Sequence, residues 1–319
     1  MSATEETAAK CGRWRSRMSW REFLAQKCRI KNELIRLFLA EFLGTWILMT
    51  FGNGSVAQSV LTAESAGTFL SVNWAYGFGV MFGVYASFNV SGGHINPAVT
   101  LAMAMLGRLQ WRKVPVYIVG QFLGTIASSA VVYGVYYDAL NNFDGGNRTV
   151  VGPTATAGIF ATYPKEYVST WTGLGDQIVG TALLLMCVCA VVDKLNADPQ
   201  QGLIPLVIGM IVVAIGLAFG SNCGYAINPA RDLGPRIFTA LAGWGGAVFS
   251  FRGYNWFWVP VVGPIVGAIL GALTYQIMVG IHWPDQVSYM VEQHPGQGHV
   301  NVEMTDPVPG STINLVSNQ

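Results

Sequence analysis

The chain has 319 residues, of which 52% are hydrophobic and only 11% are charged, and its mean hydropathy is +0.41. A soluble domain carries about 25% charged residues, so this composition excludes an ordinary globular enzyme and favours a polytopic membrane protein. The formal net charge of +1 gives no reason to expect a nucleic acid as a partner.

Residues 1–32 form a polar, basic arm. Nine of the 18 Lys and Arg residues occur by position 36, whereas the predicted outer loop at 62–68 contains none. Positive residues concentrate in cytoplasmic segments, so we predict a cytoplasmic N-terminus. A secretory signal peptide is not expected, because about thirty polar residues precede the first apolar run. A contact of the arm with acidic membrane lipid is a second role that its charge allows.

Six apolar stretches approach the length, roughly 20 residues, at which a helix spans a bilayer. They are 34–61, 70–90, 114–137, 177–192, 203–220 and 256–281. Six spans return the C-terminus to the cytoplasm, where we place a polar tail at 284–319. Small residues four positions apart, such as Gly79 and Gly83, predict close helix packing. The aromatic cluster Trp256–Trp258 is expected at the membrane interface.

The tripeptide Asn-Pro-Ala occurs twice, beginning at Asn96 and at Asn228, and each copy precedes a short helical pattern inside apolar sequence. Asn is a good N-cap, and Pro is tolerated at the first helical position because its missing N–H would be unpaired there. The first pattern, 96–106, is about 16 Å of helix and cannot span the membrane. We therefore predict two re-entrant half-helices, the second ending near residue 241.

The two halves of the chain follow the same plan. Each has span, span, half-helix and span, in repeat one (about 33–140) and repeat two (about 173–283) of a channel domain at 33–283. Glu41 precedes Asn96 by 55 residues, and Gln177 precedes Asn228 by 51. Because three spans is an odd number, the second half enters the bilayer inverted. Inverted repeats with broken helices that meet at the midplane are an architecture of solute pathways.

The polar loop at 141–172 carries an N-glycosylation acceptor at Asn147, which this topology places outside. A second acceptor sequence at Asn89 falls on the inner side and is expected to be unmodified. The five cysteines indicate neither a disulfide framework nor a metal site. We expect no metal and no other cofactor.

The paired Asn-Pro-Ala motifs, their spacing and the inverted halves resemble the major intrinsic protein (aquaporin) family over roughly residues 33–283. The resemblance implies an all-α polytopic membrane protein with six transmembrane helices and two re-entrant half-helices. It also implies a homotetramer in the plasma membrane with one pore per subunit. In the pore centre, Asn96 and Asn228 would donate to a passing solute while the positive helix ends repel cations and protons.

Alignment on the same motifs carries the family's selectivity filter to Tyr76, Gly216, Tyr225 and Arg231. Strict water channels have a His at the position of Gly216 and a small residue at that of Tyr225. Here Gly216 is expected to open space, the two tyrosines to face a carbon backbone and Arg231 to donate to hydroxyls. Asp232 after Arg231 also resembles the glycerol-conducting subfamily, and the loop sequences resemble its vertebrate members. The expected function is passive conduction of glycerol and water, with urea and other small neutral solutes as further candidates.

Two readings of the inner end of the pore remain open. In one, Glu41 accepts loop hydrogen bonds and His94 is structural. In the other, protonation of His94 rearranges Glu41 and Val99 and changes the pore width, because a His can titrate near neutral pH. Cys223 near the filter is either a site for thiol reagents or inert packing.

Two other functional classes are also open. A secondary transporter can have inverted repeats, but it needs a coupling-ion site, and the spans offer only isolated acids such as Glu41. A non-conducting adhesion or junction protein of the same fold is the other alternative, and the polar set of Asn96, Asn228 and Arg231 argues against its closed lumen. No nucleophile–base pair, phosphate loop or metal motif favours an enzyme.

Overall fold

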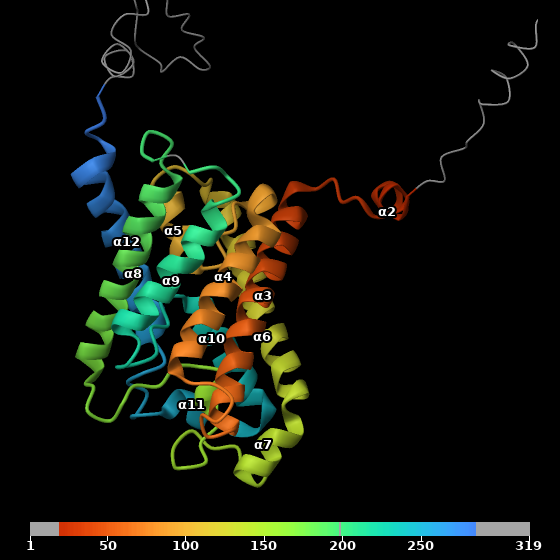
Figure 1. Ribbon diagram of the computed structural model, residues 1–319, viewed down its shortest axis with the longest axis vertical. Coiled ribbons are helices and arrows are strands. Elements are labelled where there is room, and N and C mark those ends of the chain that lie inside the picture. The colour runs from red at the N-terminus through yellow and green to blue at the C-terminus, as the bar shows by residue number, and fades with distance from the viewer. Residues whose placement is uncertain (1–18, 198, 285–319) are drawn as a thin grey trace, which may run out of the picture.

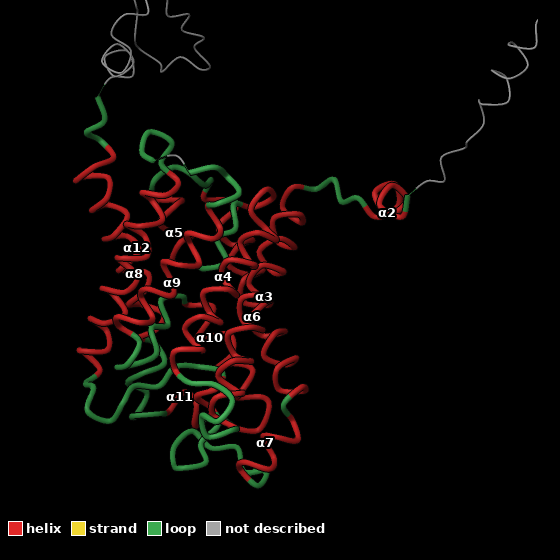
Figure 2. The backbone as a smooth tube through the Cα atoms, in the orientation of Figure 1, coloured by secondary structure: helices red, strands yellow, loops and turns green. Residues whose placement is uncertain are grey.

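The computed structural model describes residues 19–197 and 199–284, in which helices and loops are present and no strands are formed (Figures 1 and 2). The predictions for the first 18 residues of the N-terminal arm and for the tail from residue 285 lie outside the described residues.

Six long helices build the bundle in the described part of the chain (Figure 1). They are α3 (Glu33–Leu61), α4 (Phe69–Ser91), α6 (Val114–Val135), α8 (Thr170–Val192), α9 (Ile204–Phe219) and α12 (Val259–Tyr275). Four of these regions are long and apolar enough to cross a membrane, judged by length and composition. They are α3, α6 with the turn before it, α8, and α12 with the turn after it. The 16-residue α9 is apolar but shorter, and the 23-residue α4 is less hydropathic because it carries amide, hydroxyl and glycine residues.

Two short helices begin at the Asn-Pro-Ala motifs. Helix α5 (Pro97–Met105) starts directly after Asn96, and α10 (Pro229–Thr239) starts directly after Asn228. Each Asn is the N-cap and each Pro occupies the first helical turn, as the sequence predicts. In Figure 1, α5 lies in the upper half of the bundle and α10 in the lower half, so the two enter from opposite ends.

Shorter helical elements lie at the two ends of the bundle. They are α2 (Trp20–Cys28), η1 (Trp111–Lys113), α7 (Tyr137–Asp144), η2 (Ala157–Ile159), η3 (Ala240–Trp244), α11 (Ala247–Ser250) and η4 (Gln276–Gly280). Helix α2 and the C-terminal end of α12 emerge at the same end of the bundle, and α7 and α11 lie at the other (Figure 1). This is the arrangement expected when an even number of helices crosses the bundle.

Glycine allows the long helices to pack closely. A Cβ added at Gly83 would lie 2.4 Å from the carbonyl oxygen of Gly44, so α3 and α4 touch backbone to backbone there. A Cβ at Gly267 would lie 2.3 Å from the carbonyl oxygen of Ile178, which gives the same contact between α12 and α8. The predicted small-residue packing is therefore present in both halves.

Three sequence expectations differ from the structure. Helix α8 begins at Thr170, seven residues before the apolar run, because Ser169 caps it by accepting the N–H of Thr172. Part of the predicted loop is helical in α7. Trp256 is fully buried rather than interfacial, and its indole donates to the carbonyl of Thr162 at 2.8 Å, while α12 begins only at Val259.

Candidate functional site

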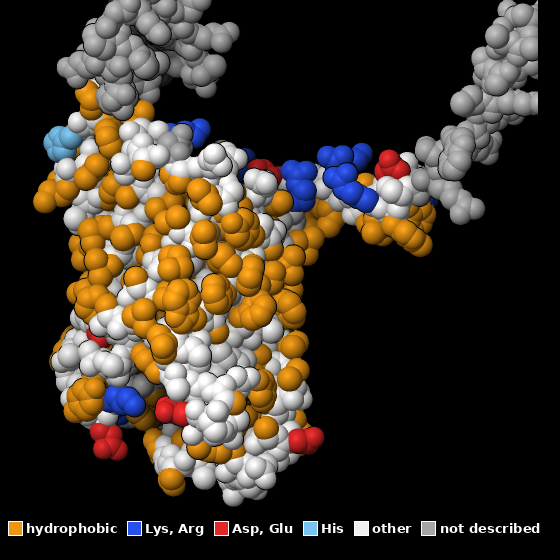
Figure 3. Space-filling model, in the orientation of Figure 1, with side chains coloured by type: hydrophobic (Ala, Val, Ile, Leu, Met, Phe, Trp, Pro, Cys, Tyr) orange, Lys and Arg blue, Asp and Glu red, His pale blue; other side chains and the backbone are white. Residues whose placement is uncertain are grey.

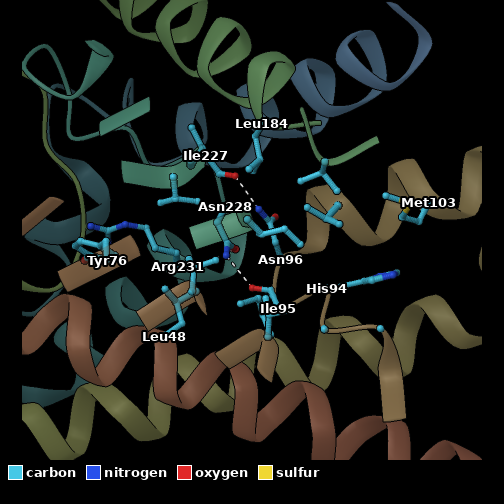
Figure 4. Close-up of a pocket in the computed structure, with 18 of the residues that line it drawn as sticks. Leu48, Tyr76, His94, Ile95, Asn96, Met103, Leu184, Ile227, Asn228 and Arg231 are labelled. Atoms are coloured by element: carbon cyan, nitrogen blue, oxygen red, sulfur yellow. Dashed lines mark hydrogen bonds between the residues drawn. The ribbon is translucent and has the colours of Figure 1, made fainter. Parts of the chain in front are cut away.

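The tips of the two half-helices are joined by a reciprocal pair of hydrogen bonds (Figure 4). The Nδ2 atom of Asn96 donates to the carbonyl of Ile227 at 2.8 Å, and that of Asn228 donates to the carbonyl of Ile95 at 2.9 Å. The Oδ1 atom of each Asn accepts from its own helix, from the N–H of Ala98 or Ala230. The sequence motif thus caps its own helix and binds the other half at once.

Ile95 and Ile227 hold an unusual backbone conformation. Their φ angles are +44° and +42°, in the left-handed region that a β-branched residue rarely adopts. This conformation turns each carbonyl towards the asparagine of the opposite repeat. Strain of this kind persists where the surrounding structure determines it, and here the backbone N–H of Ile95 also bonds Glu41 at 2.7 Å.

A cavity of about 250 Å³ passes the paired asparagines. Apolar side chains of the long helices line it, including Leu48, Val80, Val84, Leu184, Val188 and Val212. The loops before the half-helices line it as well, including Gly92, Gly93, His94, Ala226 and Ile227, together with both asparagines. An Asn amide has two N–H donors, and in the described structure only one of each is used, so the second remains for a solute.

Arg231 and two tyrosines meet at one end of this cavity. The Arg231 guanidinium donates to the carbonyl of Phe160 at 3.2 Å and lies 4.8 Å from the centroid of the Tyr76 ring. The Tyr76 and Tyr225 rings meet edge to face at 6.2 Å. Figure 4 shows Tyr76 and Arg231 on one side of the asparagines and His94 on the other. The structure therefore brings the four predicted filter positions together, because Gly216 also adjoins Tyr225.

The space beside Gly216 is filled, whereas the sequence suggested that it would be open. A Cβ at Gly216 would lie 2.4 Å from Oδ1 of Asn73 and 2.7 Å from Cζ of Tyr225. Gly216 therefore makes room for the Tyr225 ring and for Asn73. The pore gains an aromatic wall at this position, not a void.

A buried ion pair supports the segment that holds Arg231, and sequence reasoning missed it. Asp232 accepts from both the N–H (2.6 Å) and the hydroxyl (2.5 Å) of Thr162, and it pairs with Arg236 at 2.8 Å. Arg236 also donates to the carbonyls of Thr162 and Val248 at 2.7 and 2.9 Å. Thr162 follows Phe160 by two residues, so these bonds fix the carbonyl that Arg231 uses. The signal in the sequence was an Asp and an Arg four residues apart in an apolar region.

Glu41 is fully buried and accepts four hydrogen bonds. One oxygen accepts from the Ser91 hydroxyl (2.5 Å) and the His94 N–H (3.1 Å). The other accepts from the Ile95 N–H (2.7 Å) and the Gln121 amide (2.7 Å). Four donors match the acceptor capacity of a carboxylate, so Glu41 anchors the loop before α5.

His94 contacts Glu41 through its backbone and not through its ring. The imidazole Nδ1 lies 3.2 Å from the Thr100 hydroxyl, which donates to the carbonyl of Asn96 at 3.0 Å. The same hydroxyl accepts from Gln121 at 3.0 Å, and Gln121 reaches Glu41. A chain of side chains thus links the His94 ring to Glu41. Val99 is buried and lines the cavity beside His94.

The second repeat places Gln177 where the first has Glu41. Gln177 accepts the N–H of Ile227 at 2.9 Å and donates to the Cys223 sulfur at 3.1 Å. Cys223 is 1% exposed, which favours packing over a site for thiol reagents.

The two acceptor sequences for glycosylation differ in accessibility. Asn147 is exposed and follows α7, which lies at the end of the bundle opposite α2. The next residue, Arg148, forms an ion pair with Asp144. In the sequon at Asn89, the hydroxyl of Ser91 is buried against Glu41.

The helices and the paired half-helix tips define an inverted-repeat membrane protein with a polar constriction at its centre. The model of the Major intrinsic protein family matches residues 29–275, and the chain belongs to this family. Its predicted fold class is thereby confirmed.

Two relatives and one solved structure are similar over most of the chain. Aquaporin-10 of Milnesium tardigradum is 52% identical over 281 residues, which cover 84% of this chain and 68% of that protein. Aquaporin-10 of Homo sapiens is 49% identical over 257 residues, 81% of this chain and 85% of that protein. The X-ray structure of the aquaglyceroporin from Plasmodium falciparum matches with a TM-score of 0.70 at 30% identity, covering 78% of this chain and 98% of that chain.

Proposed function

We propose that this protein is a passive channel for glycerol and water that excludes ions and protons and also admits urea and other small neutral solutes. The observation that carries the proposal is the reciprocal pairing of Asn96 and Asn228 at a cavity that both apolar side chains and polar groups line. The relatives named aquaporin and aquaglyceroporin support the same function.

The chemistry of the cavity suits a polyol. The apolar side chains that line the cavity contact the carbon backbone of the solute, while the asparagine amides and loop carbonyls exchange hydrogen bonds with its hydroxyls. Both half-helices direct their N-terminal ends at the centre, where partial positive charge disfavours cations. In this proposal Tyr76, Tyr225 and Gly216 shape an aromatic corner, and Arg231 donates to hydroxyls.

Stopped-flow measurements on proteoliposomes test the function. Vesicles with the protein are expected to equilibrate glycerol and water faster than empty vesicles, without saturation and without an ion gradient. Equal rates in protein-bearing and empty vesicles would overturn the proposal, and saturable, gradient-coupled uptake would indicate a transporter instead. Arg231→Ala is expected to increase cation leakage, because it removes the positive charge at the constriction.

The location, oligomeric state, topology and glycosylation of the channel are further parts of the same proposal. We place the channel domain at 33–283 in the plasma membrane as a homotetramer, with both termini cytoplasmic and Asn147 glycosylated outside. Glycosidase treatment is expected to reduce the mass of the wild type and to leave Asn147→Gln unchanged. Protease protection in sealed cells tests the topology, and native mass spectrometry tests the tetramer.

The pH response of the inner end is the remaining assignment. We assign Glu41, His94 and Val99 to a pH-dependent constriction, with the Thr100–Gln121 chain as the connection between His94 and Glu41. Glycerol permeability of the wild type is expected to change between about pH 8 and 4, because an unperturbed His titrates between about pH 5 and 8 and burial lowers the pKa of His94 to about 4. His94→Ala is expected to remove that change, and a flat wild-type profile would contradict the assignment.

A further inference from the structure

Helix α2 stands apart from the bundle and exposes large apolar side chains (Figure 1). None of its nine residues is buried, and Trp20, Leu24 and Phe23 are 79%, 52% and 42% exposed. An isolated helix this short is marginal in water, even though Ser19 and Glu22 form a capping box at its start. None of the other described residues covers its apolar side, so a further surface must cover it for the helix to be stable.

The helix is amphipathic. Trp20, Phe23 and Leu24 are spaced by three and four positions, so they share one face, while Glu22 and Ala25 lie on the opposite face. Lys27 falls within the apolar face near the helix end, where its long stem can lie on an apolar surface and its ammonium can reach the edge.

The charge around α2 is strongly positive. Residues 19–36 carry five basic and two acidic side chains, a net charge of +3. One of the acids, Glu33, already bonds Lys113 at 2.7 Å, and the other caps α2. In Figure 3 the hydrophobic atoms of this segment lie along its lower edge, on the side towards the hydrophobic surface of the bundle. Its Lys and Arg atoms lie mainly above them.

The position of α2 in the chain indicates that the membrane surface covers its apolar face. Only residues 29–32 separate it from α3, and four extended residues span at most about 14 Å. Since α3 crosses the membrane, the bilayer surface is always within reach of α2. A basic amphipathic helix with Trp, Phe and Leu on one face binds such surfaces, and the cytoplasmic leaflet is rich in anionic lipid.

We propose that α2 lies in the interface of the leaflet at the N-terminal end of α3, with its apolar face at the acyl boundary and its basic residues on anionic headgroups. The inference rests on α3 spanning the membrane and is independent of which solute the channel conducts. Helix α2 contributes no residue to the cavity, so its lipid contact and the permeability can be measured separately.

The test uses the full-length chain in proteoliposomes, with its five cysteines replaced and one environment-sensitive fluorophore attached. Phe23→Cys carries the label on the apolar face, and Ala25→Cys is the matched control on the opposite face. Vesicles contain phosphatidylcholine with or without phosphatidylserine, and a quencher is fixed to lipid at shallow acyl depth. Glycerol permeability is recorded on the same vesicles.

The label at position 23 is expected to be quenched strongly, and the label at 25 weakly. Quenching at 23 is expected to rise with phosphatidylserine and to fall with salt, because screening weakens charge attraction at a surface. Combined Arg21→Glu, Lys27→Glu and Lys31→Glu substitutions are expected to reduce quenching at 23 to the level at 25, with glycerol permeability unchanged. Equal quenching at both positions, or no response to phosphatidylserine, would overturn the proposal. If the labelled chain without charge substitutions showed no glycerol permeability, this result would contradict the proposed channel function and not the lipid contact of α2.

Discussion

The ring of Tyr225 occupies the space that a side chain at Gly216 would need. A Cβ added at Gly216 would lie 2.7 Å from Cζ and 2.9 Å from Oη of Tyr225. The two side-chain positions therefore pack as one unit, although they are nine positions apart in the sequence. A histidine at position 216 would require the Tyr225 ring to move out of this space.

We expect Gly216→Ala to reduce glycerol permeability by about tenfold, which corresponds to about 1.4 kcal/mol of barrier. The added methyl pushes the Tyr225 ring towards the pore, and overpacking of a filled site costs about 1–3 kcal/mol. Tyr225→Ala in the same chain is expected to restore part of the permeability, because it removes the contact with the ring but leaves the contact with Oδ1 of Asn73. Gly54→Ala is the control, since a Cβ there meets nothing within 4 Å. A Gly216→Ala variant as fast as this control would contradict the prediction.

The buried pair of Asp232 and Arg236 predicts a stability effect. Both side chains are 0% exposed, so Asp232→Asn leaves a buried guanidinium without its carboxylate and is expected to destabilise the fold by about 3–5 kcal/mol. Permeability is expected to fall as well, because the Thr162 segment carries the Phe160 carbonyl that bonds Arg231.

A double-mutant cycle separates this pair from general damage. Asp232→Asn combined with Arg236→Met removes both charges and is expected to be more stable than either single variant, as read from thermal unfolding in detergent. Additive losses would show that the two residues act independently.

Glu41→Gln is expected to destabilise the protein by about 1–3 kcal/mol. Each carboxylate oxygen of Glu41 accepts one backbone N–H, from His94 or from Ile95, and an amide has only one oxygen. One of these N–H groups therefore loses its partner. Glu33→Gln, the same change at an exposed position of the same helix, is expected to cost much less, because exposed ion pairs contribute little. Equal unfolding temperatures of the two variants would refute the anchoring role.

Asp193 predicts an acid-dependent contribution to stability. It follows α8 and accepts from the Tyr275 hydroxyl at 2.8 Å and the Trp283 indole at 3.1 Å. Partial burial raises the pKa of Asp193, but the hydrogen bonds from Tyr275, the Leu195 N–H and Trp283 outweigh it and hold the pKa below its usual range.

A lowered folded-state pKa stabilises the fold above the unfolded-state value, about 3.9 for Asp, and this stabilisation is lost as the pH falls through the folded-state value. Wild type is therefore expected to unfold at a higher temperature than Asp193→Asn near pH 7, and the difference is expected to vanish in strong acid. A difference that stays constant with pH would mean that the carboxylate charge is irrelevant.

Local patterns in the sequence predicted most of the architecture. Apolar length located the long helices, and the Asn-Pro pairs located the first residues of α5 and α10 because capping is a local interaction. The early start of α8 was missed because its first turns mix polar residues and glycine with isolated apolar side chains. Helix α7 was missed because its eight residues mix polar and apolar side chains and form no apolar run.

The contacts that complete the site could not be read from local patterns. The bond from Asn96 to Ile227 joins residues 131 positions apart, and the bond from Arg231 to Phe160 ends on a backbone carbonyl that has no sequence signature. The filling of the space at Gly216 depends likewise on how Tyr225 is turned by its backbone, whose φ is +34°. Residue types identified the participants, but their partners follow from the tertiary arrangement.

The crossed bonds of Asn96 and Asn228 also constrain how the protein is made. Neither repeat contains the acceptor that its own asparagine needs, since each uses the isoleucine carbonyl of the other. A first repeat inserted ahead of the second would hold an unpaired amide and an unpaired carbonyl in a medium of low polarity, which costs several kcal/mol. The constriction can therefore complete its hydrogen bonds only when both repeats are in place, and a chain truncated after its first half lacks the partner for Asn96.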